Sequence, residues 1–436
     1  MKKLLLITYD FPPRGGGGVI RNTKFVKYLP EFGWLPVVLT VRHLNTLMTD
    51  DTLTSELSPD VHVERISPLL SPEFYSRYRR VILTSKLEAS VNVEEKKTIK
   101  SRIKDVYTFF EDMVLVPDNK ISWLPNAMTH GFKLLRDFRI DVMMTSAPPH
   151  STHLIGLALK KRVPIPWLID FRDEWIDNPY FAPKYQIRAR FEASLEKQVV
   201  NACDYLIANT AKSGAHFCSR FPHFKSKIDH ITNGYDEADY SALKVDSRKK
   251  SVYTIAYVGS ISMKRTPTAF FQALHALFEE KPELRNRLRV EFVGPFYDVH
   301  RALLERFSLQ DQVLIRGNLS HEQGLTHMVN ADALLLLLNP GEANEGIVPG
   351  KTYEYLRAKR PILAIVPRGA VSDLVENYAD HVLATPDHVP QIKEAIDRMV
   401  HDQYEPSRSK NSIRIFDRKQ LCGVLAGKLD SLVKQR

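Results

Sequence analysis

Residues 345–360 read EGIVPGKTYEYLRAKR and separate two apolar runs, residues 333–338 and 361–366. Pro349 and Gly350 are unfavourable inside a helix, so they predict a helix that begins at about Lys351 and ends at about Ala358. The apolar run on either side predicts a buried strand. The stretch therefore predicts a strand–helix–strand unit, around which the rest of the chain is interpreted.

The start of this helix has the features of an anion site. Helix N-termini carry partial positive charge, and Lys351 adds a full charge there. Tyr353 and Leu356 are expected to pack on the sheet, whereas Glu354 points to another side, where its carboxylate can accept hydrogen bonds from sugar hydroxyls. We interpret the stretch as a site for a phosphate with a ribose one turn later. An ordinary turn with a solvated Glu354 is the alternative.

Length and composition limit the class of protein. A chain of 436 residues suggests two or three domains, and contents of 44% hydrophobic and 26% charged residues are typical of globular proteins. Three cysteines without metal-ligand spacing are expected to be reduced thiols in a cytosol. We expect neither a signal peptide nor a membrane span, because no apolar run is long enough. The net charge of +10 suits a nucleotide, a nucleic acid or a lipid head group.

The N-terminal part predicts a strand, a helix and a strand at residues 2–8, 21–29 and 35–41. Between the first two lies the loop DFPPRGGGG, residues 10–18, whose glycines would let bare N–H groups approach a ligand. The loop matches neither the dinucleotide fingerprint nor the Walker motif. A plain flexible loop is the alternative interpretation.

Residues 67–126 differ from the rest because basic and aromatic residues alternate there. Basic residues include Arg77, Arg79, Arg80, Lys86, Lys96, Lys97, Lys100, Arg102 and Lys104, and aromatic residues include Phe74, Tyr75, Tyr78, Tyr107, Phe109 and Phe110. We interpret the segment as one or two amphipathic helices inserted in the first domain. Contact with an anionic membrane and a solvated insertion both explain this composition.

The remaining pattern predicts two α/β halves joined by a polar linker at residues 239–251. Strands are expected at residues 141–146, 166–170, 205–209, 228–232, 253–258, 289–293 and 313–316, and helices at 152–161, 192–201, 268–278, 321–330, 389–400 and 420–433. The sequence DFRDEW, residues 170–175, ends a strand where doubly wound sheets place ligands. A structural salt-bridge cluster is the alternative there.

Five segments in this order resemble glycosyltransferase family 4, whose members are retaining enzymes of the GT-B architecture. They are FPPRGGGGVIR (11–21), ACDYLIANT (202–210), ITNGYD (231–236), YVGSISMKR (257–265) and EGIVPGKTYEYLRAKRPILA (345–364). The resemblance implies two Rossmann-like, doubly wound parallel-sheet domains that face each other across a cleft. Residues 1–236 would form the acceptor domain, residues 252–410 the nucleotide-sugar domain, and residues 411–436 a helix that packs back on the first domain.

The resemblance also assigns roles to residues. Glu354 would bind the donor ribose, and Arg172, Asp173 and Glu345 would act in catalysis by orienting the sugar or the acceptor. The remaining donor contacts would be Gly16, Gly17, Gly18, Arg21, Lys264, Arg265, Gly346, Gly350, Lys351 and Thr352. The sequence departs from the family at three points. Eight residues rather than seven separate the two glutamates, which puts Gly346 at the strict position; Ser260 follows the glycine of the second-domain opening, where an arginine is frequent; and Arg172 stands where a histidine is common.

The function that the resemblance implies is transfer of a sugar, with retention, from a nucleoside-diphosphate sugar to a glycan or lipid-linked acceptor. The setting would be bacterial surface polysaccharide synthesis in the cytoplasm, at the inner face of the membrane. No metal, other cofactor or nucleic-acid partner is expected. Three alternatives stay open: a GT-B-type sugar-nucleotide epimerase, a Rossmann dehydrogenase, which the missing fingerprint disfavours, and a non-enzymatic basic protein that binds nucleic acid or membrane.

Overall fold

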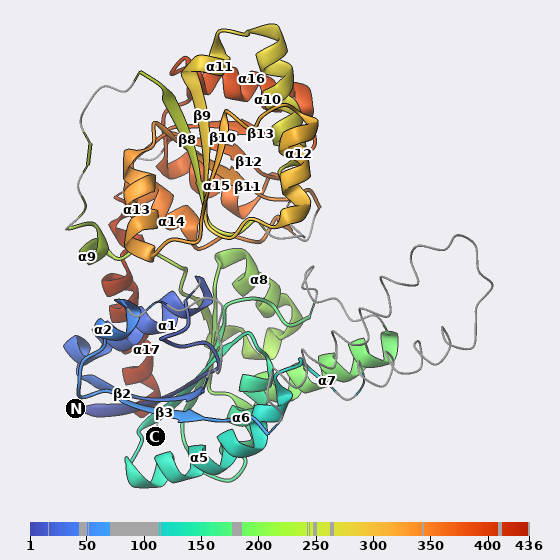
Figure 1. Ribbon diagram of the computed structural model, residues 1–436. Helices are drawn as coiled ribbons and strands as arrows, with labels where there is room; N and C mark the ends of the chain where they lie inside the picture. Colours follow the sequence, from blue (N-terminus) through green and yellow to red (C-terminus); the bar gives the residue numbers. More distant parts are fainter. Residues whose placement is uncertain are drawn as a thin grey trace. The chain divides into compact units, whose positions relative to one another are not determined.

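The computed structural model describes most of the chain as two compact units (Figure 1). Unit 1 comprises Met1–Ile231 and Cys422–Arg436, and unit 2 comprises Thr232–Leu421. The described residues are 1–15, 17–42, 50, 52–69, 113, 115–176, 185–241, 243, 245–246, 251–261, 266–341, 344–408 and 412–434. Most of the predicted insert at residues 67–126 lies outside these ranges, so its helices stay a prediction. No helix in the described ranges is long and apolar enough to cross a membrane.

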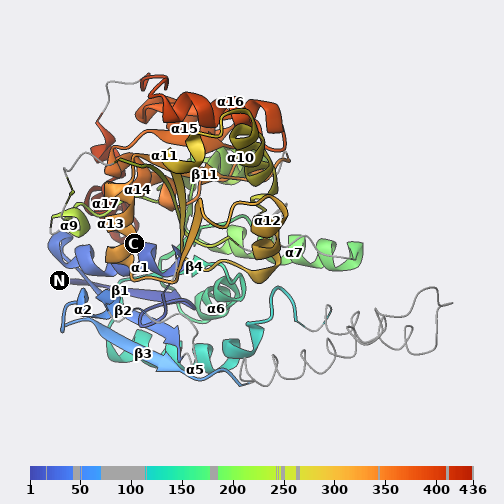
Figure 2. The ribbon, with the colours of Figure 1, turned by 45° about the horizontal axis from the view of Figure 1, so that its top comes forward.

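The described part of unit 1 contains a seven-stranded parallel sheet in the order β3-β2-β1-β4-β5-β6-β7. The strands are β1 (Lys2–Thr8), β2 (Trp34–Val41), β3 (His62–Ile66), β4 (Val142–Ala147), β5 (Trp167–Phe171), β6 (Tyr205–Ala208) and β7 (Ile228–His230). Figure 2 shows the first three side by side, in agreement with their register. The apolar runs of the central strands are buried because crossover helices cover a parallel sheet on both faces.

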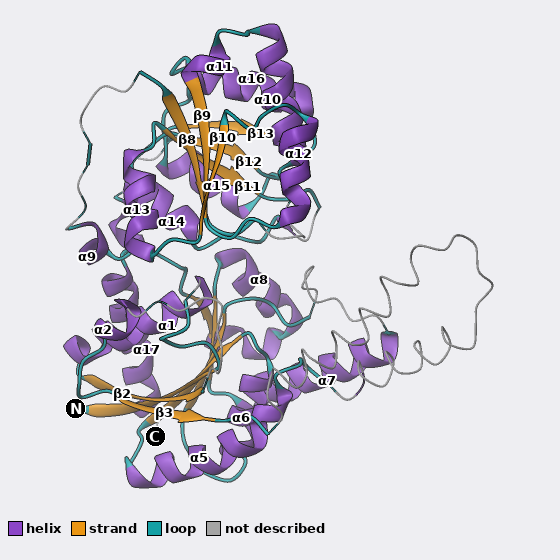
Figure 3. Cartoon of the chain, in the orientation of Figure 1, coloured by secondary structure: helices purple, strands orange, loops and turns teal. Residues whose placement is uncertain are grey.

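The described residues of unit 1 form helices α1 (Gly17–Tyr28), α2 (Thr52–Ser55), α5 (Leu124–Asp137), α6 (Ser151–Lys160), α7 (Gln186–Ala202) and α8 (Ala211–Arg220) (Figure 3). Helix α17 (Arg418–Lys434) belongs to the unit from Cys422 onward. Its Asp430 forms an ion pair with Lys2 and accepts a hydrogen bond from Trp34 Nε1 at 3.0 Å. Residues distant in the sequence therefore complete one core.

The described part of unit 2 contains a six-stranded parallel sheet in the order β10-β9-β8-β11-β12-β13. Its strands are β8 (Tyr253–Val258), β9 (Leu288–Val293), β10 (Val313–Gly317), β11 (Ala333–Leu337), β12 (Ile362–Ile365) and β13 (His381–Ala384). Its helices are α9 (Glu237–Tyr240), α10 (Thr268–Glu280), α11 (Leu284–Arg287), α12 (Arg301–Arg306), α13 (His321–Asn330), α14 (Lys351–Ala358), α15 (Ala370–Tyr378) and α16 (Val389–Val400). One apolar cluster lies on each face of this sheet.

The predicted α/β class is confirmed, and so are the bounds of α13, α14 and α16. Helix α1 begins at Gly17, four residues before the predicted start, because tertiary packing overrides the low helix propensity of glycine. Elements that the sequence analysis missed are α2, α5, α8, α9, α11, α12, α15, β3 and β13. All of them except α5 are short, so each offers few residues in which a period can be read. Helix α5 buries Ala127, Gly131, Leu134 and Leu135 at helical spacing, a signal that the sequence analysis did not use.

Candidate active site

Two glycines keep side chains away from the carboxyl edge of the unit 2 sheet. Gly259 follows β8 and Gly294 follows β9, with φ values of +131° and +129°. The Gly259 N–H donates to Val293 O at 2.7 Å. A Cβ on Gly294 would lie 2.5 Å from the Gly259 carbonyl oxygen, so a side chain there would push two strand ends apart. Bare backbone therefore lines the edge at which doubly wound sheets bind ligands.

Helix α14 begins at the same edge, with Gly350 as its N-cap. In its first turn the Thr352 N–H donates to Pro349 O at 2.9 Å. Thr352 is also fully buried, and its predicted contact with a ligand stays a prediction. Tyr355, which the sequence analysis did not single out, fixes the helix to the sheet. Its hydroxyl accepts from Val258 N at 2.8 Å and donates to Leu335 O at 3.2 Å.

The charge of Lys351 lies at the end of β8. Its Nζ is 3.3 Å from the centroid of the Tyr257 ring and 5.9 Å from that of Tyr355. A Cβ on Gly259 would meet this Nζ at 3.3 Å, so the glycine makes room for the ammonium group. Aromatic faces attract cations within about 6 Å. The arrangement holds a full positive charge beside bare backbone and the start of a helix, as an anion site requires.

Glu354 faces a histidine that the sequence analysis did not single out. Its Oε1 lies 3.0 Å from His321 Nε2, and His321 Nδ1 lies 3.7 Å from Asp239 Oδ2. The Glu354 side chain is 11% exposed and that of His321 is 18% exposed. His321 is the first residue of α13, which follows β10, so α13 and α14 bring the two side chains together at one edge of the sheet. The predicted position of Glu354 off the packing face is thus confirmed, but the carboxylate is paired rather than solvated.

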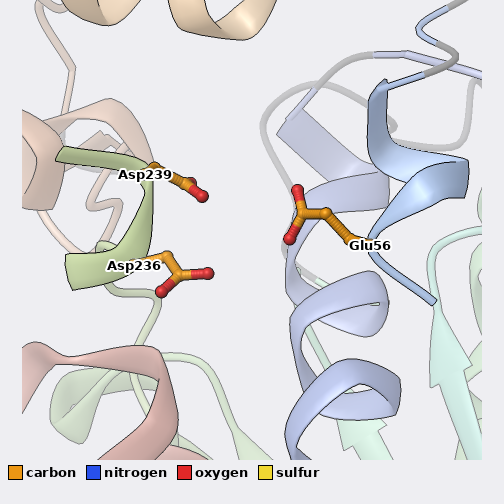
Figure 4. A group of neighbouring side chains, drawn as sticks. All are labelled: Glu56, Asp236 and Asp239. Atoms are coloured by element: carbon orange, nitrogen blue, oxygen red, sulfur yellow. The ribbon is translucent and has the colours of Figure 1, made fainter. Parts of the chain in front are cut away.

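The short helix α9 is fastened to α14. Tyr240 Oη donates to the Glu354 carbonyl oxygen at 3.0 Å. The Arg357 guanidinium binds both carboxylate oxygens of Glu237, at 2.5 and 2.6 Å, and its Cζ lies 4.6 Å from the Tyr240 ring centroid. Asp236 caps α9, and Asp239 projects from the same helix (Figure 4). These contacts fix the segment that carries Asp239.

The loop before α14 is held by hydrogen bonds to main-chain carbonyl groups. Glu345 O accepts from Ala370 N at 2.7 Å, and Asn344 Nδ2 donates to Asn339 O at 3.2 Å. Gly369 has a φ of +151°, and a Cβ there would lie 2.3 Å from Glu345 O, so this contact requires glycine. Glu345 and Gly346 are partly buried in this loop, and their predicted sugar contacts stay a prediction.

Arg21 does not reach a ligand site. Its Nη2 donates to Asp170 Oδ1 at 2.8 Å, its Nε donates to Asp170 Oδ2 at 3.3 Å, and both side chains are buried. Ser146 Oγ donates to the same carboxylate at 2.7 Å. The predicted donor contact of Arg21 is therefore wrong. The salt-bridge interpretation of the acidic segment holds for Asp170, whose carboxylate ties α1 to β5.

Arg172 is also buried, and it binds main-chain carbonyl groups. Its guanidinium donates to Gly18 O, to Pro148 O and, at 3.3 Å, to Ala147 O. A Cβ on Gly18 would lie 3.0 Å from Nη1 of this arginine, although Gly18 itself is exposed. We correct the predicted role of Arg172 accordingly: it forms a structural contact with the Gly18 carbonyl group. The donor contact of Gly18 stays a prediction. Asp173 is exposed, and its predicted catalytic role is untested.

Two histidines next to Arg172 are buried and neutral. Burial and the Arg172 charge lower the pKa of His153 to about 3, and burial lowers the pKa of His150 well below its usual value. The His150 ring stacks on Trp175 with centroids 5.1 Å apart, and the His153 ring packs edge-on against Phe171 at 4.5 Å. Their aromatic packing supports the end of β5. They carry no charge to a ligand at neutral pH.

Three predicted contact residues, Gly16, Lys264 and Arg265, lie outside the described residues, and for Gly17 the structure describes the backbone alone. Their donor contacts stay predictions.

Three basic side chains gather at the carboxyl edge of unit 1. Arg65 Nη2 donates to Pro12 O at 2.7 Å, and Lys120 Nζ lies 5.6 Å from the Tyr9 ring centroid. Arg14 pairs with Asp10. Burial lowers the pKa of Lys120, and the charge of Arg14 lowers it further. A bound anion would relieve this repulsion between two cations.

Comparison with protein families gives two matches. The description "Glycosyl transferases group 1" matches residues 242–415, and "Glycosyltransferase Family 4" matches residues 93–239. Together they cover more than half of the chain. A similar curated protein is the D-inositol 3-phosphate glycosyltransferase of Kribbella flavida, 28% identical over 105 residues. The match spans 23% of this chain and 25% of that protein's length.

Solved structures share the whole architecture at low identity. The sucrose-phosphate synthase of Thermosynechococcus elongatus is 12% identical with a TM-score of 0.61, and the match covers 100% of this chain and 97% of that one. A glycosyltransferase from Rickettsia africae is 13% identical with a TM-score of 0.57, over 100% and 96% of the two chains. These likenesses show the fold, which is GT-B. With the two family matches, they establish that the chain belongs to the group 1 and family 4 glycosyltransferases.

Proposed function

We propose that the protein transfers a sugar from a nucleoside-diphosphate sugar to an acceptor, with retention at the anomeric carbon. The observation that carries this proposal is in unit 2: Lys351 and Glu354, one helical turn apart, lie at the carboxyl edge of the sheet beside the bare backbone of Gly259. The spacing fits a diphosphate at the start of α14 and the ribose hydroxyls at Glu354. The substrate class of family 4 points the same way.

The chemistry follows from the charge that develops on the leaving diphosphate. The ammonium group of Lys351 and the positive end of α14 would stabilise that charge in a fixed geometry. Loss of one such donor typically raises the barrier by about 2.7–4 kcal/mol. Lys264 and Arg265 are proposed to add to this effect on the basis of the family resemblance, as are contacts from Glu345, Gly346 and Gly350.

The acceptor is proposed to be a lipid-linked glycan carrying phosphate. Arg14, Arg65 and Lys120 support an anionic group at the carboxyl edge of unit 1, where Lys120 is partly desolvated beside Arg14. A lipid-linked acceptor would place the reaction at the cytoplasmic face of a membrane, in surface polysaccharide synthesis. The basic composition of residues 67–126 is in keeping with contact with anionic lipid.

The decisive experiment incubates the purified protein with a panel of UDP-, GDP-, ADP- and dTDP-sugars, with and without a lipid-diphosphate-linked glycan. We expect one donor to be consumed, and the anomeric configuration of the product, measured by NMR, to match that of the donor. Inversion at the anomeric carbon would contradict the proposed mechanism. Conversion of the nucleotide sugar to an epimer without any acceptor would instead support the epimerase alternative.

A further inference from the structure

His321 is placed between two carboxylates. Nε2 faces Glu354 Oε1 at 3.0 Å, and Nδ1 faces Asp239 Oδ2 at 3.7 Å. A carboxylate accepts hydrogen bonds and donates none, so the nitrogen that faces Glu354 must carry its proton. The ring is therefore a donor to Glu354, and its second nitrogen is oriented by Asp239.

The ring is held by a rigid frame. His321 is the first residue of α13, whose start is fixed by a capping box: Gln323 N donates to Ser320 Oγ at 3.3 Å, and Ser320 N donates to Gln323 Oε1 at 3.0 Å. On the opposite side, Tyr240 and the Arg357–Glu237 pair fasten α9 to α14. Three helices thus converge on one imidazole ring.

The charges around the ring explain why a histidine stands there. Glu354 and Arg357 face this region from α14, and Asp239 and Glu237 face it from α9. Arg357 is already bound by both oxygens of Glu237, so it is not the partner of Glu354. The imidazole of His321 lies between the carboxylates of Glu354 and Asp239, with one ring nitrogen facing each.

We infer that His321 is a positioning residue for Glu354: it holds Oε1, so that the carboxylate meets the ribose hydroxyls of the donor in one orientation. Asp239 in turn fixes the ring of His321. The inference rests on the proposed function, because it assigns a nucleotide ribose to Glu354. It adds a Glu354–His321–Asp239 chain that gives the site its preference for ribose over deoxyribose.

The test is calorimetric titration with UDP, GDP and ADP, followed by titration with the 2′-deoxy form of the nucleotide that binds most tightly. Glu354→Gln should weaken binding of the ribonucleotide about ten- to a hundredfold. His321→Ala should weaken it about three- to tenfold and reduce the ratio of ribonucleotide to deoxynucleotide affinity. His321→Gln retains an N–H donor at a similar reach and should restore most of the loss.

A double variant separates positioning from a general structural effect. If His321 acts through Glu354, adding His321→Ala to Glu354→Gln should change affinity by less than twofold. His327→Ala is the matched control, because His327 lies on the same helix and pairs with a carboxylate, that of Glu291, at 2.9 Å. It should leave nucleotide affinity unchanged. Thermal melts of all variants check folding.

Different results would refute the donor site at Glu354 and the positioning role of His321. If Glu354→Gln folds and binds all three ribonucleotides as the parent does, the proposed donor site is wrong. If Glu354→Gln weakens binding but His321→Ala does not, or if the two effects add fully, the positioning role is wrong and the donor site stands. An unchanged ribose-to-deoxyribose ratio in folded His321→Ala would also overturn the inference.

Discussion

Replacing Arg21 by Met should destabilise unit 1 strongly without affecting nucleotide binding. The guanidinium makes two hydrogen bonds to Asp170, and neither side chain has access to water. The substitution leaves a buried carboxylate with Ser146 Oγ as a donor. Breaking a buried ion pair in this way costs about 3–5 kcal/mol, a large part of a total stability of about 5–15 kcal/mol.

Tryptophan fluorescence isolates the unit that the substitution affects. All four tryptophans, Trp34, Trp123, Trp167 and Trp175, are buried in unit 1. Urea unfolding of the full chain should therefore show a lower midpoint for Arg21→Met by this signal. Adding Asp170→Asn removes the buried charge and should recover part of the loss. A parent-like midpoint together with weaker nucleotide binding would refute the structural role and restore Arg21 to the donor site.

Four further outcomes are expected. Sugar transfer should survive EDTA, because protein cations act on the leaving group; activity that vanishes with chelator and returns with Mg²⁺ or Mn²⁺ would contradict this. Gly294→Ala should lower the melting temperature of the full chain by circular dichroism, because its Cβ would meet Gly259 O at 2.5 Å in a positive-φ conformation. The Glu291 carboxylate accepts hydrogen bonds from His327 and Arg316, which lower its pKa to about 2. Glu291→Gln should therefore lower the free energy of unfolding by about 2–3 kcal/mol at pH 7. The difference in melting temperature between parent and variant should close as the pH falls from about 4.5 towards 2. A pH-independent difference would rule out this linkage. Sedimentation should show binding to anionic but not neutral vesicles at low salt, and its absence would favour a solvated insertion at residues 67–126.

Elements with strong local signals could be predicted from the sequence. Helix α14 is bounded by Pro349 and Gly350 at its start and lies between two fully apolar strands, so its bounds followed from local chemistry. Helix α8 could not be found in this way, because its sequence AKSGAHFCSR has few apolar residues. Its start is nevertheless capped by Thr210, which accepts from Ser213 N at 3.0 Å. That cap was the available signal.

The candidate site could be predicted only in part. Glu354 was placed by its spacing from the helix start, but His321 is 33 positions away in the sequence and reaches it through the order of strands β10, β9, β8 and β11. Arg21 was assigned to a ligand because it follows the glycine loop, and Arg172 because it ends a strand where doubly wound sheets place ligands. In the structure both side chains are buried and bind protein groups, Asp170 and the Gly18 carbonyl group. Tertiary structure alone brings these partners close, so the sequence could not reveal them.

Helix α17 has a consequence for the order in which the molecule is assembled during translation. The contacts of Lys2 and Trp34 with Asp430 can form only late, because the ribosome adds Asp430 after the whole of unit 2. Unit 2 is continuous in sequence and can fold as it emerges, whereas Lys2, Trp34 and Asp229 of unit 1 lack their contacts with α17 until that helix is made. The interval during which a chaperone could recognise nascent unit 1 is therefore set by the length of unit 2.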